Sequence, residues 1–73
     1  MDFIRIVFDR LYSAGSPDAQ ERAVIYAECR DMVTAAYANP AKLKTALEEL
    51  EKVIRRQEMQ ALYEESLQPR GEK

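Results

Sequence analysis

The sequence has 73 residues and a net charge of −2, from 11 basic and 13 acidic side chains. This balance disfavours strong attraction to nucleic acid or to an anionic membrane. With one cysteine and no histidine, the chain cannot form an internal disulfide or a zinc site that is built from pairs of cysteine or histidine ligands. A chain of this length forms one domain at most and buries only about 60% of its unfolded surface. We therefore expect self-association, or docking on a larger partner, to complete the fold.

Polar residues interrupt the apolar stretches of the sequence. No apolar run approaches the roughly 18 residues that a membrane span needs. Asp2, Arg5 and Asp9 break up the apolar start of the chain, unlike the core of a signal peptide. The single unpaired thiol suits a reducing compartment. These features favour a soluble, cytoplasmic protein without a membrane span.

The first predicted helix covers residues 2–14 and ends before Gly15, because glycine readily adopts the left-handed conformation that closes a helix. Its polar side carries Arg5 and Asp9. Its apolar side is formed by Phe3, Ile4, Val7, Phe8 and Leu11. Most residues of the segment FIRIVF also favour strands, so a short N-terminal strand is the alternative.

The second predicted helix covers residues 17–38, with Ser16 as its N-cap and Pro17 as its first helical residue. Its apolar side is formed by Ile25, Cys29, Met32, Val33 and Ala36. Burial on that side raises the pKa of a thiol, and the sequence has no histidine to act as its base. We interpret Cys29 as a structural residue of the core.

Arg22, Tyr26 and Arg30 follow one another at helical spacing along one edge of this apolar side. Such a strip can receive a phosphate or a nucleotide base. In the alternative, structural interpretation, the side-chain stems cover the edge of the core and the guanidinium groups pair with carboxylates of a neighbouring helix. We expect the structural role, with at least one of the two arginines paired with Glu48 or Glu51.

The third predicted helix covers residues 40–67, with Asn39 as its N-cap and Pro40 as its first residue. It carries two apolar faces in succession. The first is a regular seam formed by Leu43, Leu47, Leu50 and Ile54. The second is rotated around the helix by more than a third of a turn and is formed by Met59, Leu62, Tyr63 and Leu67. Because the first face packs within the domain, we predict that the second binds a partner chain.

Charged side chains of the third helix allow two further interpretations. Lys52, Arg55 and Arg56 form a small basic group, which acidic residues bracket on both sides and which is thin for nucleic-acid binding. The carboxylates of the segment LEELE do not match a di-metal bundle, since that motif needs a histidine three residues after a glutamate. No glycine-rich phosphate loop occurs in the sequence. We expect no cofactor, no metal and no catalytic residue.

The segment RAVIYAECRDMV, followed by KTALEELEKV, resembles a helical segment that recurs in alphaproteobacterial proteins of uncharacterised function. The likeness covers residues 17–53. The matching positions are Arg22, Ile25, Tyr26, Arg30, Asn39, Pro40, Leu47, Glu48 and Glu51. Over a shorter span, MQALYEESLQP is similar to a helix of small alphaproteobacterial anti-sigma factors. Neither resemblance implies an active site.

The sequence thus predicts a single all-α domain over residues 1–67, followed by a disordered tail at 68–73. The second and third helices should form a long antiparallel hairpin, with the shorter N-terminal helix packed on it. We predict a non-catalytic protein–protein interaction module that is a homodimeric adaptor or regulator. The alternative is a small inhibitor of the anti-sigma or antitoxin kind, with one protein target. A nucleic-acid-associated accessory protein is the third possibility.

Overall fold

A computed structural model describes residues 2–67, which form three α-helices. They are α1 (Phe3–Ser13), α2 (Ala19–Ala36) and α3 (Pro40–Leu67). The predicted all-α class is therefore confirmed, and the alternative of an N-terminal strand is wrong. The predicted tail at 68–73 lies outside the described residues.

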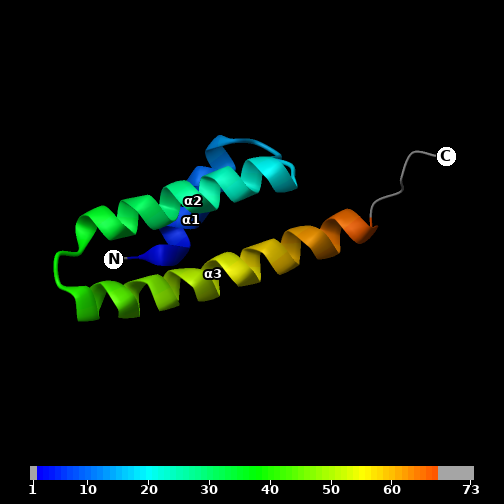
Figure 1. Cartoon of the computed structure of the whole chain (residues 1–73). Coiled ribbons are helices and arrows are strands. Elements are labelled where there is room, and N and C mark those ends of the chain that lie inside the picture. Colours follow the sequence, from blue (N-terminus) through cyan, green and yellow to red (C-terminus); the bar gives the residue numbers. More distant parts are fainter. Residues whose placement is uncertain (1, 68–73) are drawn as a thin grey trace.

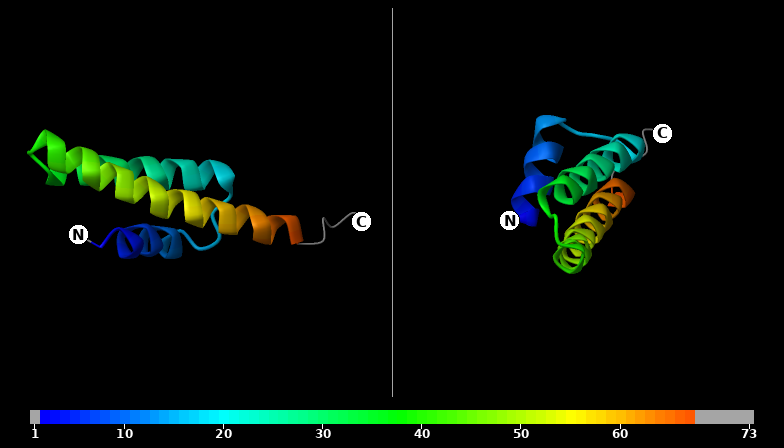
Figure 2. Two further views of the ribbon diagram at one scale, coloured as in Figure 1. Left: turned by 90° about the horizontal axis from the view of Figure 1, so that it is seen from below. Right: turned by 60° about the vertical axis from the view of Figure 1, so that its left-hand side comes forward.

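The helices α2 and α3 run antiparallel and side by side, as Figure 1 shows. The shorter α1 contacts both of them. In Figure 2, α1 lies along one side of the hairpin and reaches only part of the length of α3. The C-terminal end of α3 therefore extends beyond the cover that α1 provides.

The start of α2 differs from the prediction. Its N-cap is Asp18, whose carboxylate accepts a hydrogen bond from the backbone N–H of Glu21 at 2.8 Å. The Glu21 carboxylate accepts in return from the backbone N–H of Asp18, also at 2.8 Å. This reciprocal capping box satisfies two N–H groups, so it fixes the helix start two residues later than Ser16 and Pro17 would.

The turn between α2 and α3 follows the predicted chemistry. The helix α2 ends at Ala36, two residues before the predicted end at residue 38, because Tyr37 adopts an extended conformation. The Asn39 side chain then accepts hydrogen bonds from the backbone N–H groups of Ala41 and Lys42, at 2.9 and 3.1 Å. Asn39 is therefore the N-cap of α3, which satisfies the free donors of its first turn.

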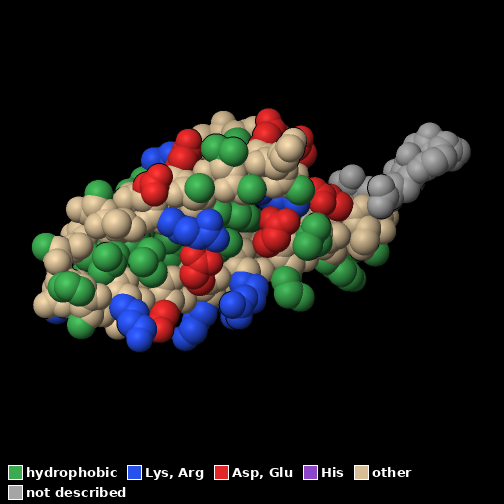
Figure 3. Space-filling model, viewed as in Figure 1, with side chains coloured by type: hydrophobic (Ala, Val, Ile, Leu, Met, Phe, Trp, Pro, Cys, Tyr) green, Lys and Arg blue, Asp and Glu red, His purple; other side chains and the backbone are tan. Residues whose placement is uncertain are grey.

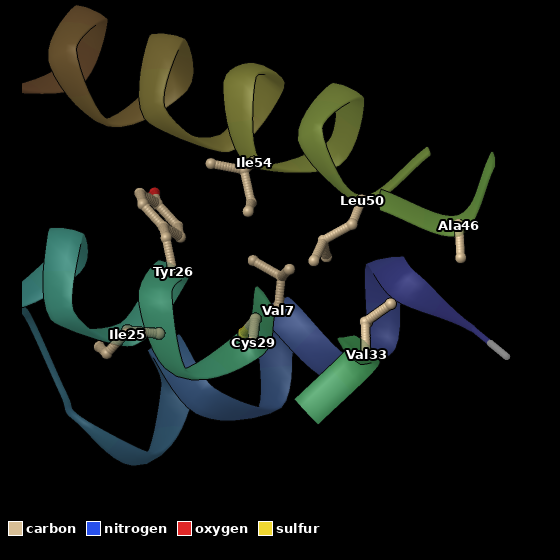
Figure 4. Packing of buried hydrophobic residues seen from close by; sticks show 8 residues of the cluster. All are labelled: Val7, Ile25, Tyr26, Cys29, Val33, Ala46, Leu50 and Ile54. Carbon is tan, nitrogen blue, oxygen red and sulfur yellow. The ribbon is translucent and has the colours of Figure 1, made fainter. Parts of the chain in front are cut away.

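Side chains from all three helices meet in one small core, shown in Figure 4. Its buried members are Val7, Ile25, Tyr26, Cys29, Val33, Ala46, Leu50 and Ile54. Two predicted core positions of α1 are wrong, since Ile4 and Phe8 remain about half exposed while Phe3, Ile6 and Leu11 pack beside Val7. Ala36, at the end of α2, is also exposed. The core is thus centred on Val7, Cys29 and Leu50.

Candidate functional site

The C-terminal third of α3 carries four large apolar side chains in solvent. Met59, Leu62, Tyr63 and Leu67 are between 50% and 66% exposed. At about 100° per residue, Met59 and Tyr63 lie on the side of α3 opposite to the buried Leu50. The sequence predicted this second apolar face, and the structure leaves all four of its residues at the surface.

Arg22 joins this part of α3 to the first turns of α2. Its side chain is only 4% exposed. Its Nε and Nη2 atoms donate to the two carboxylate oxygens of Glu58 at 2.9 and 3.0 Å. Its Nη1 atom donates to Glu65 at 2.8 Å and to the carbonyl oxygen of Pro17 at 3.0 Å. One buried guanidinium therefore binds two carboxylates two helical turns apart, which fixes residues 58–65 against α2.

The hydrogen bonds of this cluster change the acid–base behaviour of its members. Hydrogen bonding to Glu58, and then to Glu65, raises the pKa of Arg22. The same bond to Arg22 lowers the pKa of Glu58 below its ordinary value. Both ions are thus stabilised in their charged forms.

Tyr26 lies next to this ion cluster, with its ring packed in the core beside Ile54 (Figure 4). Its hydroxyl oxygen is buried and has no hydrogen-bond partner among the described residues. Burial raises the pKa of Tyr26 to about 12, and the negative charge of Glu58 adds to this rise. The neutral phenol is therefore the form that the fold favours.

Arg30 pairs with Glu51 across the same interface. Its Nε and Nη2 atoms donate to the Glu51 carboxylate at 2.5 and 3.1 Å, and both side chains are partly exposed. Hydrogen bonding to Arg30 lowers the pKa of Glu51. The expected pairing of one arginine with Glu48 or Glu51 is thus present as Arg30–Glu51. Glu48 itself is exposed and forms no ion pair within residues 2–67.

Sequence reasoning missed the partners of Arg22, although the sequence holds the signal that finds them. The hairpin turns at Asn39 and Pro40, so residues equally far before and after this turn lie opposite each other. That register places Arg30 near Glu51 and Arg22 near Glu58. Glu65 follows Glu58 by two turns on the same side of α3, which puts it within reach of the same guanidinium.

The outward face of α3 carries the basic group and two adjoining shallow hollows. The first hollow is lined by apolar side chains of Pro40, Leu43 and Leu47, together with Lys44, Glu48, Glu51, Lys52 and Arg55. The second is lined by Lys52, Arg55, Arg56, Met59, Gln60 and Tyr63. Lys52 and Arg55 line both hollows, which otherwise face different sides of α3.

Cys29 is fully buried between the three helices. Burial raises the pKa of its thiol, which keeps it protonated at neutral pH. Its predicted place in the core is confirmed.

Within residues 2–67, no group of three or more His, Cys, Asp or Glu side chains is placed to hold a metal ion. None of the helices in the described part combines the length and the apolar character needed to cross a membrane. Comparisons with protein-family models, with curated proteins and with solved structures give no match for this chain.

Proposed function

We propose that this protein is a non-catalytic interaction module, which binds another protein chain through the C-terminal third of α3. The observation that supports this function is the exposed apolar face of Met59, Leu62, Tyr63 and Leu67. Large apolar side chains that gather at a surface usually mark a binding site, because their exposure to water has a free-energy cost. Here they occupy about 12 Å of one helix.

The ion cluster of Arg22 supports the same function. Glu58 and Glu65 both bind Arg22, and the helix turns between them carry Met59, Leu62 and Tyr63. This part of α3 is therefore ordered before a partner arrives. A preordered helix loses less conformational entropy on binding than a segment that must fold at that moment.

Two forms of this function agree with the exposed face. In the first, a second copy of the chain covers it, and the protein is a homodimeric adaptor or regulator. Such burial would supply several kcal/mol at about 25 cal/mol per Å², a large addition for so small a core. In the second, the helix occupies a groove on one target, as an inhibitor of the anti-sigma or antitoxin kind does.

Replacing Leu62 and Tyr63 together by Asp tests the proposed function. We expect the double variant to keep its α-helical circular dichroism and to lose association, measured as molar mass by light scattering and as partner capture from native lysate. Replacing Tyr12 and Val24 by Asp is the matched control, since both are exposed apolar residues on the other two helices. A Leu62→Asp, Tyr63→Asp variant that associates as the parent does would contradict the proposal.

A further inference from the structure

Met59 lies at the centre of an outward face of α3 that changes character along the helix. At about 100° per residue, Arg55 and Arg56 lie within 60° of Met59 one turn before it, and Leu62 and Tyr63 lie within 60° of it one turn after. All five side chains, which we call the Met59 face, are exposed. In Figure 3, Lys and Arg side chains along the lower edge of α3 are followed, toward its C-terminal end, by hydrophobic ones. The Met59 face thus has a basic half and an apolar half.

The arginines of this face are available to another chain. Within residues 2–67, neither Arg55 nor Arg56 forms an ion pair. Glu51 lines a hollow beside Arg55, but its carboxylate already binds Arg30. The buried Arg22 holds two later carboxylates of α3 on the side that faces α2. The Met59 face itself carries no acidic side chain.

An antiparallel second copy matches this face to itself. When two α3 helices pair about a twofold axis at Met59, the basic half of each copy lies opposite the apolar half of the other. Residues on the same flank then meet, so that Arg56 faces Tyr63 of the second copy and Arg55 faces its Leu62. A guanidinium over an aromatic ring makes a favourable cation–π contact, and the aliphatic stem of an arginine packs on leucine.

A parallel pairing in register does not suit the same face. It would place Arg55 and Arg56 beside the same two residues of the second copy, and like charges held together oppose association. In the antiparallel pairing, the two copies of Arg56 lie about 9 Å apart along the helix axes, and those of Arg55 about 12 Å. Charge therefore selects the antiparallel orientation.

The apolar area of this part of α3 is sufficient for a specific contact. Met59, Leu62 and Tyr63 are 66%, 50% and 62% exposed. Together with Leu67 and the arginine stems, each copy offers on the order of 500 Å², so two copies bury about 1,000 Å². That area is the lower limit for a stable biological interface.

We propose that two copies of the chain associate through antiparallel α3 helices, with Met59 on the twofold axis and Arg56 against Tyr63 of the second copy. This inference rests on the proposed function and selects the homodimer from its two forms. The dimer covers the same apolar residues that would enter a groove on a target. Self-association and the binding of a target at this face therefore exclude each other.

Disulfide formation between introduced cysteines tests this arrangement. Two cysteines form a bridge only when their Cα atoms lie within about 7 Å of each other. Met59→Cys should therefore form a covalent dimer under mild oxidation, roughly tenfold faster than Val24→Cys, an exposed control on α2. Arg56→Cys and Tyr63→Cys should each react at the control rate alone, and should form a mixed dimer rapidly when combined. The native Cys29 is buried and does not contribute.

The molar mass of the parent chain, measured by light scattering, provides a second readout and should be that of a dimer. A monomeric parent, or a Met59→Cys variant that reacts no faster than the control, would overturn the inference. Arg56→Cys that links to itself as readily as Met59→Cys would also overturn it, because that result indicates a parallel pairing. If Leu62→Asp with Tyr63→Asp still abolishes the capture of a target in those cases, the proposed function stands in its second form.

Discussion

Arg22 and Glu58 form a two-point ion pair across the interface of α2 and α3, with N–O distances of 2.9 and 3.0 Å. The guanidinium is buried, while the carboxylate keeps part of its surface in water. The pair joins α2 to α3 at the residue before Met59, where the exposed apolar face of α3 begins. The same ion pair therefore stabilises the hairpin and holds in place the helix turns that carry the exposed apolar face.

Replacing Arg22 by Ala should lower the free energy of unfolding by about 2–3 kcal/mol. Breaking a buried ion pair costs about 3–5 kcal/mol, and the partial exposure of Glu58 and Glu65 reduces this figure. Arg30→Ala is the matched control, since its half-exposed pair with Glu51 contributes only about 0.2–1 kcal/mol. Urea unfolding of both variants provides the measurement. Equal losses of unfolding free energy in the two variants would show that burial does not strengthen the ion pairs of Arg22.

Acid should weaken the fold through Glu58 and Glu51, whose pKa values are lowered by hydrogen bonds to Arg22 and Arg30. A lowered pKa in the folded state means that the unfolded chain binds protons first as the pH falls. The stabilisation is thus complete above about pH 4.5, the ordinary value, and is lost as the pH falls through the folded-state values. Urea midpoints between neutral pH and pH 3 should decline less steeply in Glu58→Gln. A matching change in Glu48→Gln, an exposed carboxylate without an ion pair in the described part of the chain, would argue against this assignment.

Tyr26→Phe should leave the stability unchanged or raise it by up to about 1 kcal/mol. The substitution removes a buried hydroxyl that has no hydrogen-bond partner within residues 2–67, and the ring that fills the core remains. In the parent, a folded-state pKa near 12 stabilises the fold fully below pH 10 and less as the pH rises toward 12. Chemical unfolding of the variant at neutral pH provides the test. A loss above 1 kcal/mol would reveal a hydrogen bond from this hydroxyl that the structure does not contain.

Cys29→Ser should cost about 1–3 kcal/mol, because it places a hydroxyl in an apolar core. The native thiol should also react slowly with a thiol reagent at neutral pH and rapidly once urea exposes it. Rapid modification of the native protein, with its helices intact, is the outcome that this interpretation does not allow.

Much of the fold follows from local signals in the sequence. Gly15 has a φ of 81°, a backbone conformation that favours glycine, and Asn39 caps α3. Each of the two breaks between helices was therefore predictable from one residue. The apolar seam of Leu50 and Ile54 likewise indicated which side of α3 is buried. These signals depend only on nearby residues.

The remaining features depend on how the helices are placed relative to one another. The periodicity of α1 does not determine its rotation on the hairpin, so it gave no reason to expose Phe8 and bury Val7. Similarly, the carboxylates of Glu58 and Glu65 became partners of Arg22 only through the register of the hairpin. The position of the turn fixes that register, whereas the composition of α3 does not.

Hydroxyl-radical footprinting of Tyr63 tests the central claim most directly. Tyr63 lies in the apolar face, and the more exposed Tyr12, on α1, is an internal reference in the same molecule. The ratio of modification at Tyr63 to that at Tyr12 should fall as the protein self-associates or captures its partner, and should stay high in the Leu62→Asp variant. A ratio that remains constant while the molar mass increases would show that assembly uses another face, and would contradict the account.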